Sequence, residues 1–453
     1  MNIYILTEIT KRELDSNILL ACIAANNNFE VMVSNSDTIK NLNNKKFLKE
    51  GIFHTKSLVH GQKKMKLHDE IKMNKMSITS LDEEAGLVYD DLTHFCESRF
   101  SNEALSKIDK VFCWGKHDFE VLKSMYPSFI EKFVLSGSPR IDILKNNLKP
   151  YWQDNKDEKK SILISSNFNL VNGFLKTSKI IEEIQKQGFF ERSEKYKEEL
   201  EIIIPESLKK FNEFKDMIKQ LASSFPEENF VVRPHPMEKI DTWENFFSEN
   251  ENIQVNNEGN INFQLQNCKL LIHNSCTTAF QAFMYKIPTL SYEPFESRSQ
   301  YGKPANKISE RIESINSLKD EVKKILVGDF KTSKNEKREE IFNYKVFISS
   351  ISLSSELIVD TWKKISEKHV NEKNNWKQIK FELKKIQIKE KFIRFLVKIF
   401  KPFKKTYIDR KFQKISEKNI SDKVRKICSL LKYENIFCEK LSDKSFLIRK
   451  VKQ

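Results

Sequence analysis

Residues 1–33 read MNIYILTEITKRELDSNILLACIAANNNFEVMV, and this stretch decides the fold class of the chain. Two short apolar runs, Asn2–Leu6 and Glu30–Val33, have the length of buried strands. The residues between them predict a helix, because their apolar side chains recur at a spacing of three and four. A strand, a helix and a second strand of this length form a right-handed crossover, so the sequence predicts a parallel sheet. The helical apolar positions are Leu14, Ile18, Leu19, Cys22 and Ile23.

The alternation of strands and helices continues along the chain and restarts after a polar, charged break at residues 146–160. Two successive α/β halves predict two facing, doubly wound domains, which we assign to residues 1–148 and 156–350. A basic, mainly helical extension is expected over residues 351–453. The other strands that we expect are Ser77–Leu81, Lys110–Trp114, Lys132–Leu135, Ser161–Ser165, Phe230–Val232 and Lys269–Ile272, with helices at Thr177–Glu201, Ser207–Ser224 and Thr277–Tyr285.

The composition excludes several classes of protein. Of the 453 residues, 39% are hydrophobic and 11% aromatic, which fits neither a disordered nor a collagen-like chain. No apolar run approaches the roughly 18 residues that a spanning helix needs, and the N-terminus lacks the pattern of a signal peptide. Seven scattered cysteines form no C-x-x-C pair, so we expect reduced thiols in a cytoplasmic protein.

The positive charge is concentrated at the C-terminal end. Residues 371–453 contain 25 of the 78 Lys and Arg and 9 of the 63 Asp and Glu, a net charge of +16. The remaining residues carry a net charge of −1. A nucleic-acid enzyme would also be basic around its active cleft, so the sequence argues against a nucleic-acid partner.

Part of this basic segment has the pattern of a helix that lies on a membrane. Basic residues recur every three or four positions from Lys391 to Lys405, and apolar residues fill the opposite side. We therefore expect residues 386–405 to bind an anionic membrane surface. The alternative is that the apolar side packs on the second domain. The basic positions are Lys391, Arg394, Lys398, Lys401 and Lys405; the apolar positions are Phe392, Ile393, Leu396, Ile399, Phe400 and Phe403.

A phosphate group would have to be bound without a glycine-rich loop, because the chain has neither G-x-G-x-x-G nor a Walker A motif. One candidate lies between a predicted strand and a predicted helix, at the carboxyl edge of the second sheet. Hydroxyl groups and free backbone N–H groups there suit a phosphate, although Ser275 or Thr277 could simply cap the helix. The candidate residues are His273, Asn274, Ser275, Thr277 and Thr278.

A second candidate, Arg233-Pro234-His235-Pro236, ends the preceding strand. The prolines restrict the backbone at Arg233 and His235, and an Arg and a His at this edge would complete a cationic cradle for a nucleotide phosphate. A rigid turn with a purely structural role is the alternative.

The first half supplies acidic candidates. Asp82, Glu83 and Glu84 follow a predicted strand, and mutual repulsion raises at least one pKa in such a cluster, which suits a general acid or base. We include His235 among the catalytic candidates. An acidic helix start is the structural alternative. The turn at residues 137–142 is expected to place Arg140 and Asp142 at the interdomain cleft, unless they form a structural ion pair.

Taken in order, these motifs resemble the bacterial surface carbohydrate biosynthesis family, which is similar to CDP-glycerol glycerophosphotransferases and, more distantly, to capsule β-Kdo transferases. The resemblance covers roughly residues 1–350, and the chain departs from it at Ser138, where Asn is more usual, and at Ala85. The motifs are Arg12–Asp15, Asp82–Gly86, Trp114-Gly115, Gly137–Asp142, Ser166-Asn167-Phe168, Arg233–Pro236 and His273–Thr278.

The resemblance implies a GT-B architecture, with the donor nucleotide mainly on the second domain and the acceptor mainly on the first. It implies that no metal or cofactor is needed, so that protein groups neutralise the phosphate charge of the leaving nucleotide. Asn167 is an expected cleft residue on the same basis. The phosphate positions that we expect are Arg233, His235, Ser275, Thr277 and Thr278.

The expected function is transfer of a sugar or sugar acid from a nucleotide-activated donor to a lipid-linked or polysaccharide acceptor of capsule or lipopolysaccharide type. Such an enzyme would work on the inner face of the cytoplasmic membrane. Two alternatives stay open: a CDP-glycerol-type glycerophosphotransferase, and a non-catalytic protein whose basic tail binds nucleic acid or membrane.

Overall fold

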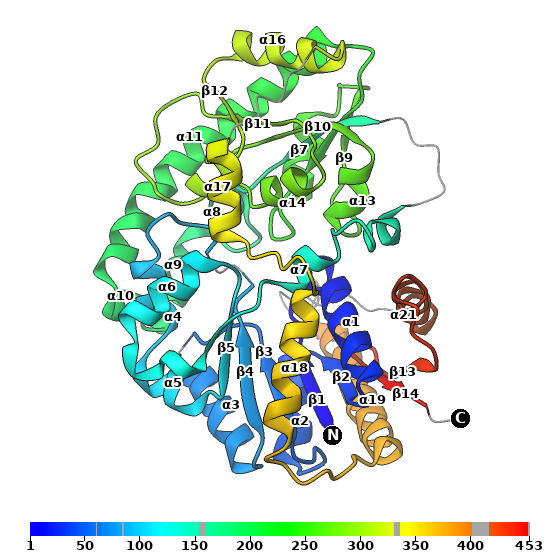
Figure 1. Cartoon of the computed structure of the whole chain (residues 1–453). Helices are drawn as coiled ribbons and strands as arrows, with labels where there is room; N and C mark the ends of the chain where they lie inside the picture. Colours follow the sequence, from blue (N-terminus) through cyan, green and yellow to red (C-terminus); the bar gives the residue numbers. More distant parts are fainter. Residues whose placement is uncertain (60, 84–85, 154–159, 330–335, 401–415, 452–453) are drawn as a thin grey trace.

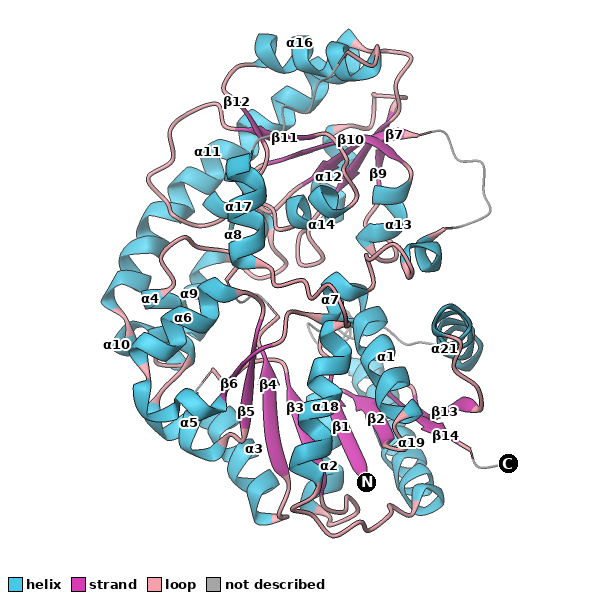
Figure 2. Cartoon of the chain, viewed as in Figure 1, coloured by secondary structure: helices cyan, strands magenta, loops and turns pink. Residues whose placement is uncertain are grey.

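The structure is a computed structural model that describes residues 1–59, 61–83, 86–153, 160–329, 336–400 and 416–451. Its two sheets belong to two domains, with the first domain below the second in Figure 1. Helices cover both faces of each sheet (Figure 2). The expected α/β architecture with two Rossmann-like domains is confirmed.

The first sheet has eight strands in the order β13-β14-β2-β1-β3-β4-β5-β6, and β1 to β6 run parallel. Its central strand is buried on both faces, because Ile3 and Ile5 enter one core and Tyr4 and Leu6 the other. The elements are β1 (Asn2–Leu6), α1 (Thr10–Asn26), β2 (Glu30–Ser34), α2 (Ser36–Asn44), β3 (Gly51–Thr55), α3 (Gln62–Met73), β4 (Ser77–Leu81), α4 (Thr93–Arg99), α5 (Asn102–Lys107), β5 (Lys110–Cys113), α6 (Lys116–Met125), η1 (Pro127–Lys132), β6 (Phe133–Leu135), α7 (Pro139–Asp142) and η2 (Lys149–Trp152).

The second sheet has six parallel strands in the order β12-β11-β10-β7-β8-β9. The polar side chains that follow β7, β8 and β10 therefore meet at one edge, which faces the first domain. The elements are β7 (Ser161–Ser165), α8 (Asn169–Asn172), α9 (Thr177–Lys186), α10 (Phe189–Arg192), α11 (Glu194–Ser224), β8 (Phe230–Arg233), α12 (Ile240–Phe246), β9 (Ile253–Val255), α13 (Ile261–Gln266), β10 (Cys268–His273), α14 (Thr278–Met284), β11 (Thr289–Tyr292), α15 (Lys303–Lys307), β12 (Glu310–Ile312), α16 (Ile315–Leu326) and α17 (Glu336–Lys345).

Several strands were not predicted from the sequence. β3 includes Gly51 and His54, which weaken its apolar signal, but the glycine is needed there. A Cβ at Gly51 would lie 2.3 Å from the carbonyl oxygen of Asn2, so only glycine lets β3 pair with β1 at this position. Three strands of the second sheet, β9, β11 and β12, were also missed, and they have only three or four residues each.

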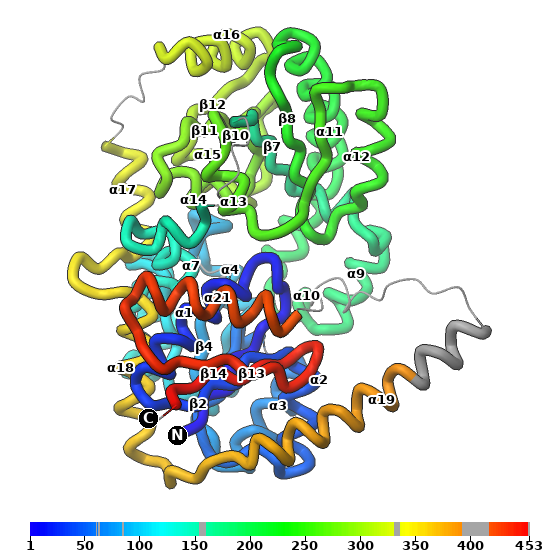
Figure 3. The backbone as a smooth tube through the Cα atoms, turned by 90° about the vertical axis from the view of Figure 1, so that its right-hand side faces the viewer, coloured from blue at the N-terminus to red at the C-terminus, as the bar shows by residue number. Residues whose placement is uncertain are grey.

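The described residues after 350 form three helices and a strand hairpin, and they pack on the first domain. The hairpin of β13 and β14 pairs through β14 with the free edge of β2, in antiparallel orientation. Leu447 and Ile448 are completely buried, as is Trp362. Figure 3 shows α21 and the hairpin lying over α1 and β2. The elements are α18 (Ser354–Ser366), α19 (Trp376–Phe400), α21 (Glu417–Leu431), β13 (Ile436–Ser442) and β14 (Ser445–Lys450).

The basic segment predicted to bind membranes begins within α19. Trp376, Ile379 and Leu383 anchor the first turns of α19 in the core of the first domain. The helix continues to Phe400, and residues 401–405 lie outside the described part of the chain. In the part of the chain that the structure describes, no helix combines the length and the apolar character needed to cross a membrane.

Candidate functional site

A cavity of about 110 Å³ lies between the two domains, and we call it the cationic cleft. The first domain contributes three cationic side chains, Lys11, Arg12 and Arg140. The second domain contributes the polar residues that follow β7, β8 and β10. The described residues that line it are Ile9, Lys11, Arg12, Arg140, Ser165, Ser166, Arg233, Pro234, His235, Pro236, Ile261, Cys276, Thr277, Thr278 and Gln281.

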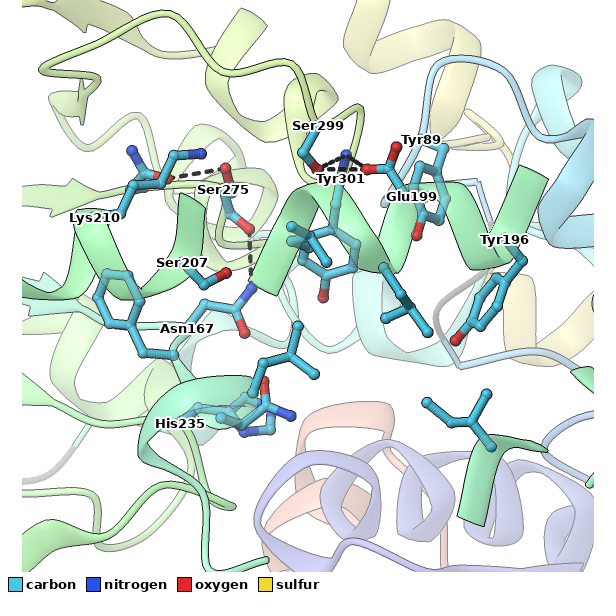
Figure 4. Close-up of a pocket in the computed structure, with 17 residues that line it drawn as sticks. Tyr89, Asn167, Tyr196, Glu199, Ser207, Lys210, His235, Ser275, Ser299 and Tyr301 are labelled. Carbon is cyan, nitrogen blue, oxygen red and sulfur yellow. Dashed lines mark hydrogen bonds between the residues drawn. The ribbon is translucent and has the colours of Figure 1, made fainter. Parts of the chain in front are cut away.

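A second cavity of about 230 Å³ lies beside the first, between α11 and the carboxyl edge of the second sheet. We call it the tyrosine chamber, because Tyr89, Tyr196 and Tyr301 reach it from three separate segments. Figure 4 shows Tyr301 and Asn167 pointing into this space, with His235 below them. His235 lines both cavities. The remaining lining residues are Phe168, Asn169, Leu170, Ile184, Glu199, Leu200, Ile203, Ser207, Lys210, Asn274, Ser275 and Ser299.

The motif after β10 is divided between the two cavities. Thr277 and Thr278 line the cationic cleft, whereas Asn274 and Ser275 line the tyrosine chamber. Asn167 donates to the carbonyl oxygen of Ser275 at 3.2 Å, so the segments after β7 and β10 are tied together at the chamber wall.

The first residue of this motif has a structural role. His273 is completely buried, and burial lowers the pKa of its ring to about 3. Its Nε2 lies 2.8 Å from the hydroxyl of Ser309, and its Nδ1 accepts from the backbone N–H of Cys276 at 3.3 Å. The ring therefore fixes the turn and lines neither cavity.

Arg233 holds a loop at the domain boundary. Its guanidinium donates to the carbonyl oxygens of Glu258 and Gly259, at 2.9 and 2.6 Å, and to the side chain of Gln264 at 2.8 Å. Burial lowers its pKa to about 10. The same loop accepts a hydrogen bond from Lys11 of the first domain at the carbonyl oxygen of Asn257, 2.9 Å away. Arg233 thus orders an interdomain contact at one side of the cleft.

A buried carboxylate holds His235 in place. Glu238 accepts from the backbone N–H of His235 at 3.1 Å, from the Ser166 hydroxyl at 2.7 Å and from the Trp243 indole at 2.9 Å. The ring Nδ1 of His235 accepts from the N–H of Met237 at 3.2 Å, so the neutral ring carries its proton on Nε2. A histidine fixed at a boundary between two cavities is suited to contact a ligand in either one.

The acidic candidates have different environments. Asp82 forms an ion pair with Arg99, with a distance of 2.8 Å between its Oδ2 and the guanidinium. Glu83 is nearly buried, and its Oε2 lies 3.6 Å from Arg140. Burial and the negative charge of Glu13 raise the pKa of Glu83 to about 7. Glu84 lies outside the described residues.

Arg140 and Asp142 separate instead of forming the structural pair that we considered. Arg140 lines the cationic cleft and donates to the carbonyl oxygen of Glu83 at 3.0 Å. Asp142 is completely buried and accepts from the backbone N–H groups of Ser354 and Ser355, at 2.8 and 2.7 Å. The carboxylate of Asp142 thus caps α18, and Asp142 does not line the cleft.

Sequence reasoning gave no role to Glu13, which anchors the cationic side of the cleft. It is fully buried, accepts from the N–H groups of Glu8 and Ile9, and contacts Arg12 at 3.1 Å and Lys56 at 3.3 Å. Burial alone would raise its pKa, but these two cations and the N–H groups lower it to about 2. The only sequence signal was the Arg-Glu pair in the first motif of the resemblance.

Among the described residues, no group of three or more His, Cys, Asp or Glu side chains is arranged to hold a metal ion. No protein-family model and no curated protein matches the sequence. The chain is, however, similar in structure to several solved proteins.

The wall teichoic acid polymerase TagF, in a structure soaked with CDPG, superposes with a TM-score of 0.52 at 12% identity, covering 82% of this chain and 90% of that one. The chain shares the GT-B fold of TagF. UDP-GlcNAc 2-epimerase of Methanocaldococcus jannaschii, in complex with UDP-GlcNAc and UDP, gives a TM-score of 0.47 at 15% identity, covering 80% of this chain and all of that one. MnaA of S. aureus with UDP gives 0.48 at 12% identity, covering 82% and 98%.

Proposed function

We propose that the protein is a glycosyltransferase that moves a sugar or sugar acid from a nucleotide-activated donor to a surface polysaccharide acceptor. The observation that carries the proposal is the cationic cleft, where Lys11, Arg12 and Arg140 of one domain face Thr277 and Thr278 of the other. Charge-assisted and hydroxyl hydrogen bonds together are suited to the phosphates of a nucleotide. The GT-B fold provides the two-domain frame in which this cleft lies.

Glu83 is not among the described residues that line either cavity, but its Oε2 lies 3.6 Å from Arg140 of the cationic cleft, and we assign it the role of general base. A carboxylate with a pKa of about 7 can accept a proton at neutral pH and release it again. The acceptor hydroxyl loses its proton to Glu83 as its oxygen bonds to the anomeric carbon of the donor sugar. The bond from that carbon to the phosphate oxygen breaks, and the electron pair stays on the nucleotide phosphate beside the cations of the cleft.

Glycerophosphate transfer from a CDP-glycerol-type donor is the second candidate. It is favoured by the similarity to TagF, whose TM-score exceeds 0.5. In that reaction the acceptor oxygen would bond to phosphorus, and the bond between the two phosphates would break to release CMP. The same cations would stabilise the leaving phosphate in both reactions, so the products must distinguish them. Sugar transfer forms a new glycosidic bond and releases a nucleoside diphosphate or CMP. Glycerophosphate transfer forms a new phosphodiester and releases CMP.

A thermal-shift screen of CMP, CDP, UDP and their sugar or glycerol derivatives tests the proposal. At a ligand concentration 100-fold above Kd, binding stabilises the folded state by about 2.7 kcal/mol. His235→Ala should weaken the best nucleotide about 10- to 150-fold, because it removes one hydrogen-bonding contact to a charged ligand. His369→Ala, which changes a histidine that lines neither cavity, should bind like the wild type. A wild type that no nucleotide stabilises, or unchanged affinity in a folded His235→Ala variant, would contradict the proposal.

We also propose that residues 386–405 hold the enzyme on the anionic inner face of the cytoplasmic membrane, near lipid-linked acceptors. Each basic residue close to an anionic surface contributes about 1 kcal/mol. The exposed fractions of Phe381 and Ile388, 60% and 68%, add apolar surface on the described part of α19.

Replacing Lys391, Arg394, Lys398, Lys401 and Lys405 by glutamine should therefore release the protein from anionic liposomes in co-sedimentation at low salt. Deletion from residue 386 onward is unsuitable, because it would also remove β13 and β14 from the first sheet. Neutralising five lysines of the second domain, Lys219, Lys239, Lys319, Lys323 and Lys324, makes the same change in net charge and is the control. Equal recovery of the wild type and the five-residue variant in the supernatant would rule out this membrane role.

A further inference from the structure

The tyrosine chamber differs in chemistry from the cationic cleft beside it. Its lining combines aromatic and aliphatic side chains with amides and hydroxyls, and Lys210 is the one lysine among the described lining residues. The Lys210 ammonium donates to the hydroxyl of Ser297 at 3.0 Å, and burial lowers its pKa. The chamber therefore suits a largely neutral ligand with both apolar and hydrogen-bonding surfaces.

The wall of the chamber is held by carboxylates of α11. Glu199 accepts from the backbone N–H groups of Gln300 and Tyr301, at 2.8 and 3.2 Å. Two turns further along, Glu206 accepts from the N–H of Arg298 at 3.0 Å. These bonds fix the segment after β11 that carries Tyr301, so the chamber is formed before any ligand enters.

The position of His235 relates the chamber to the reaction. The donor phosphates in the cationic cleft and the ligand in the chamber would meet at this residue, because it lines both cavities. In Figure 4, His235 and Tyr196 lie on different sides of the chamber. Tyr196 belongs to the helix α11, whereas His235 follows strand β8. A ligand that reaches Tyr196 extends away from the donor phosphates.

We propose that the tyrosine chamber binds two successive sugar rings of the acceptor, one with its face on Tyr196 and the next with its hydroxyls toward the side chains of Asn167 and Ser207. A tyrosine ring provides a large, rigid contact surface with a polar end, which matches the apolar C–H face and the hydroxyl rim of a pyranose. The inference rests on the proposed transferase function. It places part of the acceptor on the second domain and α11, whereas the family resemblance implied the first domain.

The test uses the full chain, an array of bacterial surface oligosaccharides and the nucleotide thermal-shift assay. Tyr196→Ala should lower binding to the glycans that the wild type recognises by at least 10-fold, while Tyr196→Phe, which keeps the ring, should retain it. Tyr344→Ala removes a half-exposed tyrosine from α17 and is the matched control. The nucleotide-induced shift should be the same in all four proteins.

Two results would overturn the inference. One is glycan binding that is absent in the wild type or unchanged in Tyr196→Ala. The other is a Tyr196→Ala variant that loses the nucleotide-induced shift, since the chamber would then hold the nucleotide. Failure of the proposed function itself is recognised separately, because the wild type would then show no nucleotide-induced shift at all.

Discussion

Replacing Glu83 by glutamine is expected to lower turnover by about 100-fold or more, with nucleotide binding nearly unchanged. The carboxylate is nearly buried, lies beside Arg140 of the cationic cleft and has a pKa of about 7. Glutamine has nearly the same shape but cannot accept a proton, so the loss should appear in turnover and not in affinity. Initial rates at saturating donor, together with nucleotide titrations, measure the two effects.

The pH dependence gives an independent check. Glu83 is a base only when ionised, so the rate of the wild type should rise with pH and level off above about pH 7. Glu83→Gln should lose this limb. Asp82→Asn is the comparison, because the Asp82 carboxylate is paired with Arg99 and its replacement should reduce stability more than it changes the pH profile. Normal turnover in Glu83→Gln would show that the residue is structural; Glu84→Gln would then be the next variant to measure.

The same carboxylate affects stability with a defined sign. Its pKa is raised in the folded protein, so between about pH 4.5 and pH 7 the folded state binds the proton more tightly than the unfolded state. The contribution of Glu83 to stability is therefore complete below this window and is lost as the pH rises through 7. The difference in melting temperature between pH 5 and pH 8 should be smaller in Glu83→Gln than in the wild type.

The sequence predicted those features that depend on local pattern. Apolar runs located most of the central strands, and polar residues after β8 and β10 located the second-domain side of the cationic cleft. It could not predict which atoms those residues would engage. Arg233 and His273 end β8 and β10, next to residues that line the cleft. The guanidinium of Arg233 nevertheless holds a loop, and the imidazole of His273 holds a turn. These assignments depend on partners 25 to 36 residues away, which no local motif contains.

The C-terminal hairpin was missed for a different reason. Its apolar residues, such as Phe446 and Ile448, are interspersed with lysines, and the prediction rested on the charge of the segment and not on its alternating apolar pattern. The two-residue turn Asp443-Lys444 between Ser442 and Ser445 was the available signal, because short turns between alternating runs indicate hairpins. Pairing with β2, a strand more than 400 residues earlier, supplies the burial that the local pattern does not suggest.

Replacing Asp142 by alanine is expected to reduce the free energy of unfolding by about 2–5 kcal/mol, with little effect on nucleotide affinity in the fraction that folds. Its two carboxylate oxygens accept from the N–H groups of Ser354 and Ser355, and Oδ2 also accepts from the Ser355 hydroxyl at 2.7 Å. Alanine would leave these buried donors at the start of α18 without an acceptor. The change is therefore expected to weaken the attachment of α18, which buries Trp362 against the first domain.

Chemical denaturation of the wild type, Asp142→Ala and Asp142→Asn measures this effect, and the asparagine variant should lose less because it keeps one side-chain oxygen. Nucleotide titration of the same proteins separates the two roles considered for this residue. A cap at α18 predicts reduced stability with retained affinity, because Asp142 does not line the cleft. Retained stability with a large loss of affinity would instead place Asp142 in the cleft, as the Gly137–Asp142 turn alone suggested. Asp142 and its partner Ser354 are separated by 212 residues in the sequence. Only the folded structure therefore distinguishes a helix cap from a ligand contact.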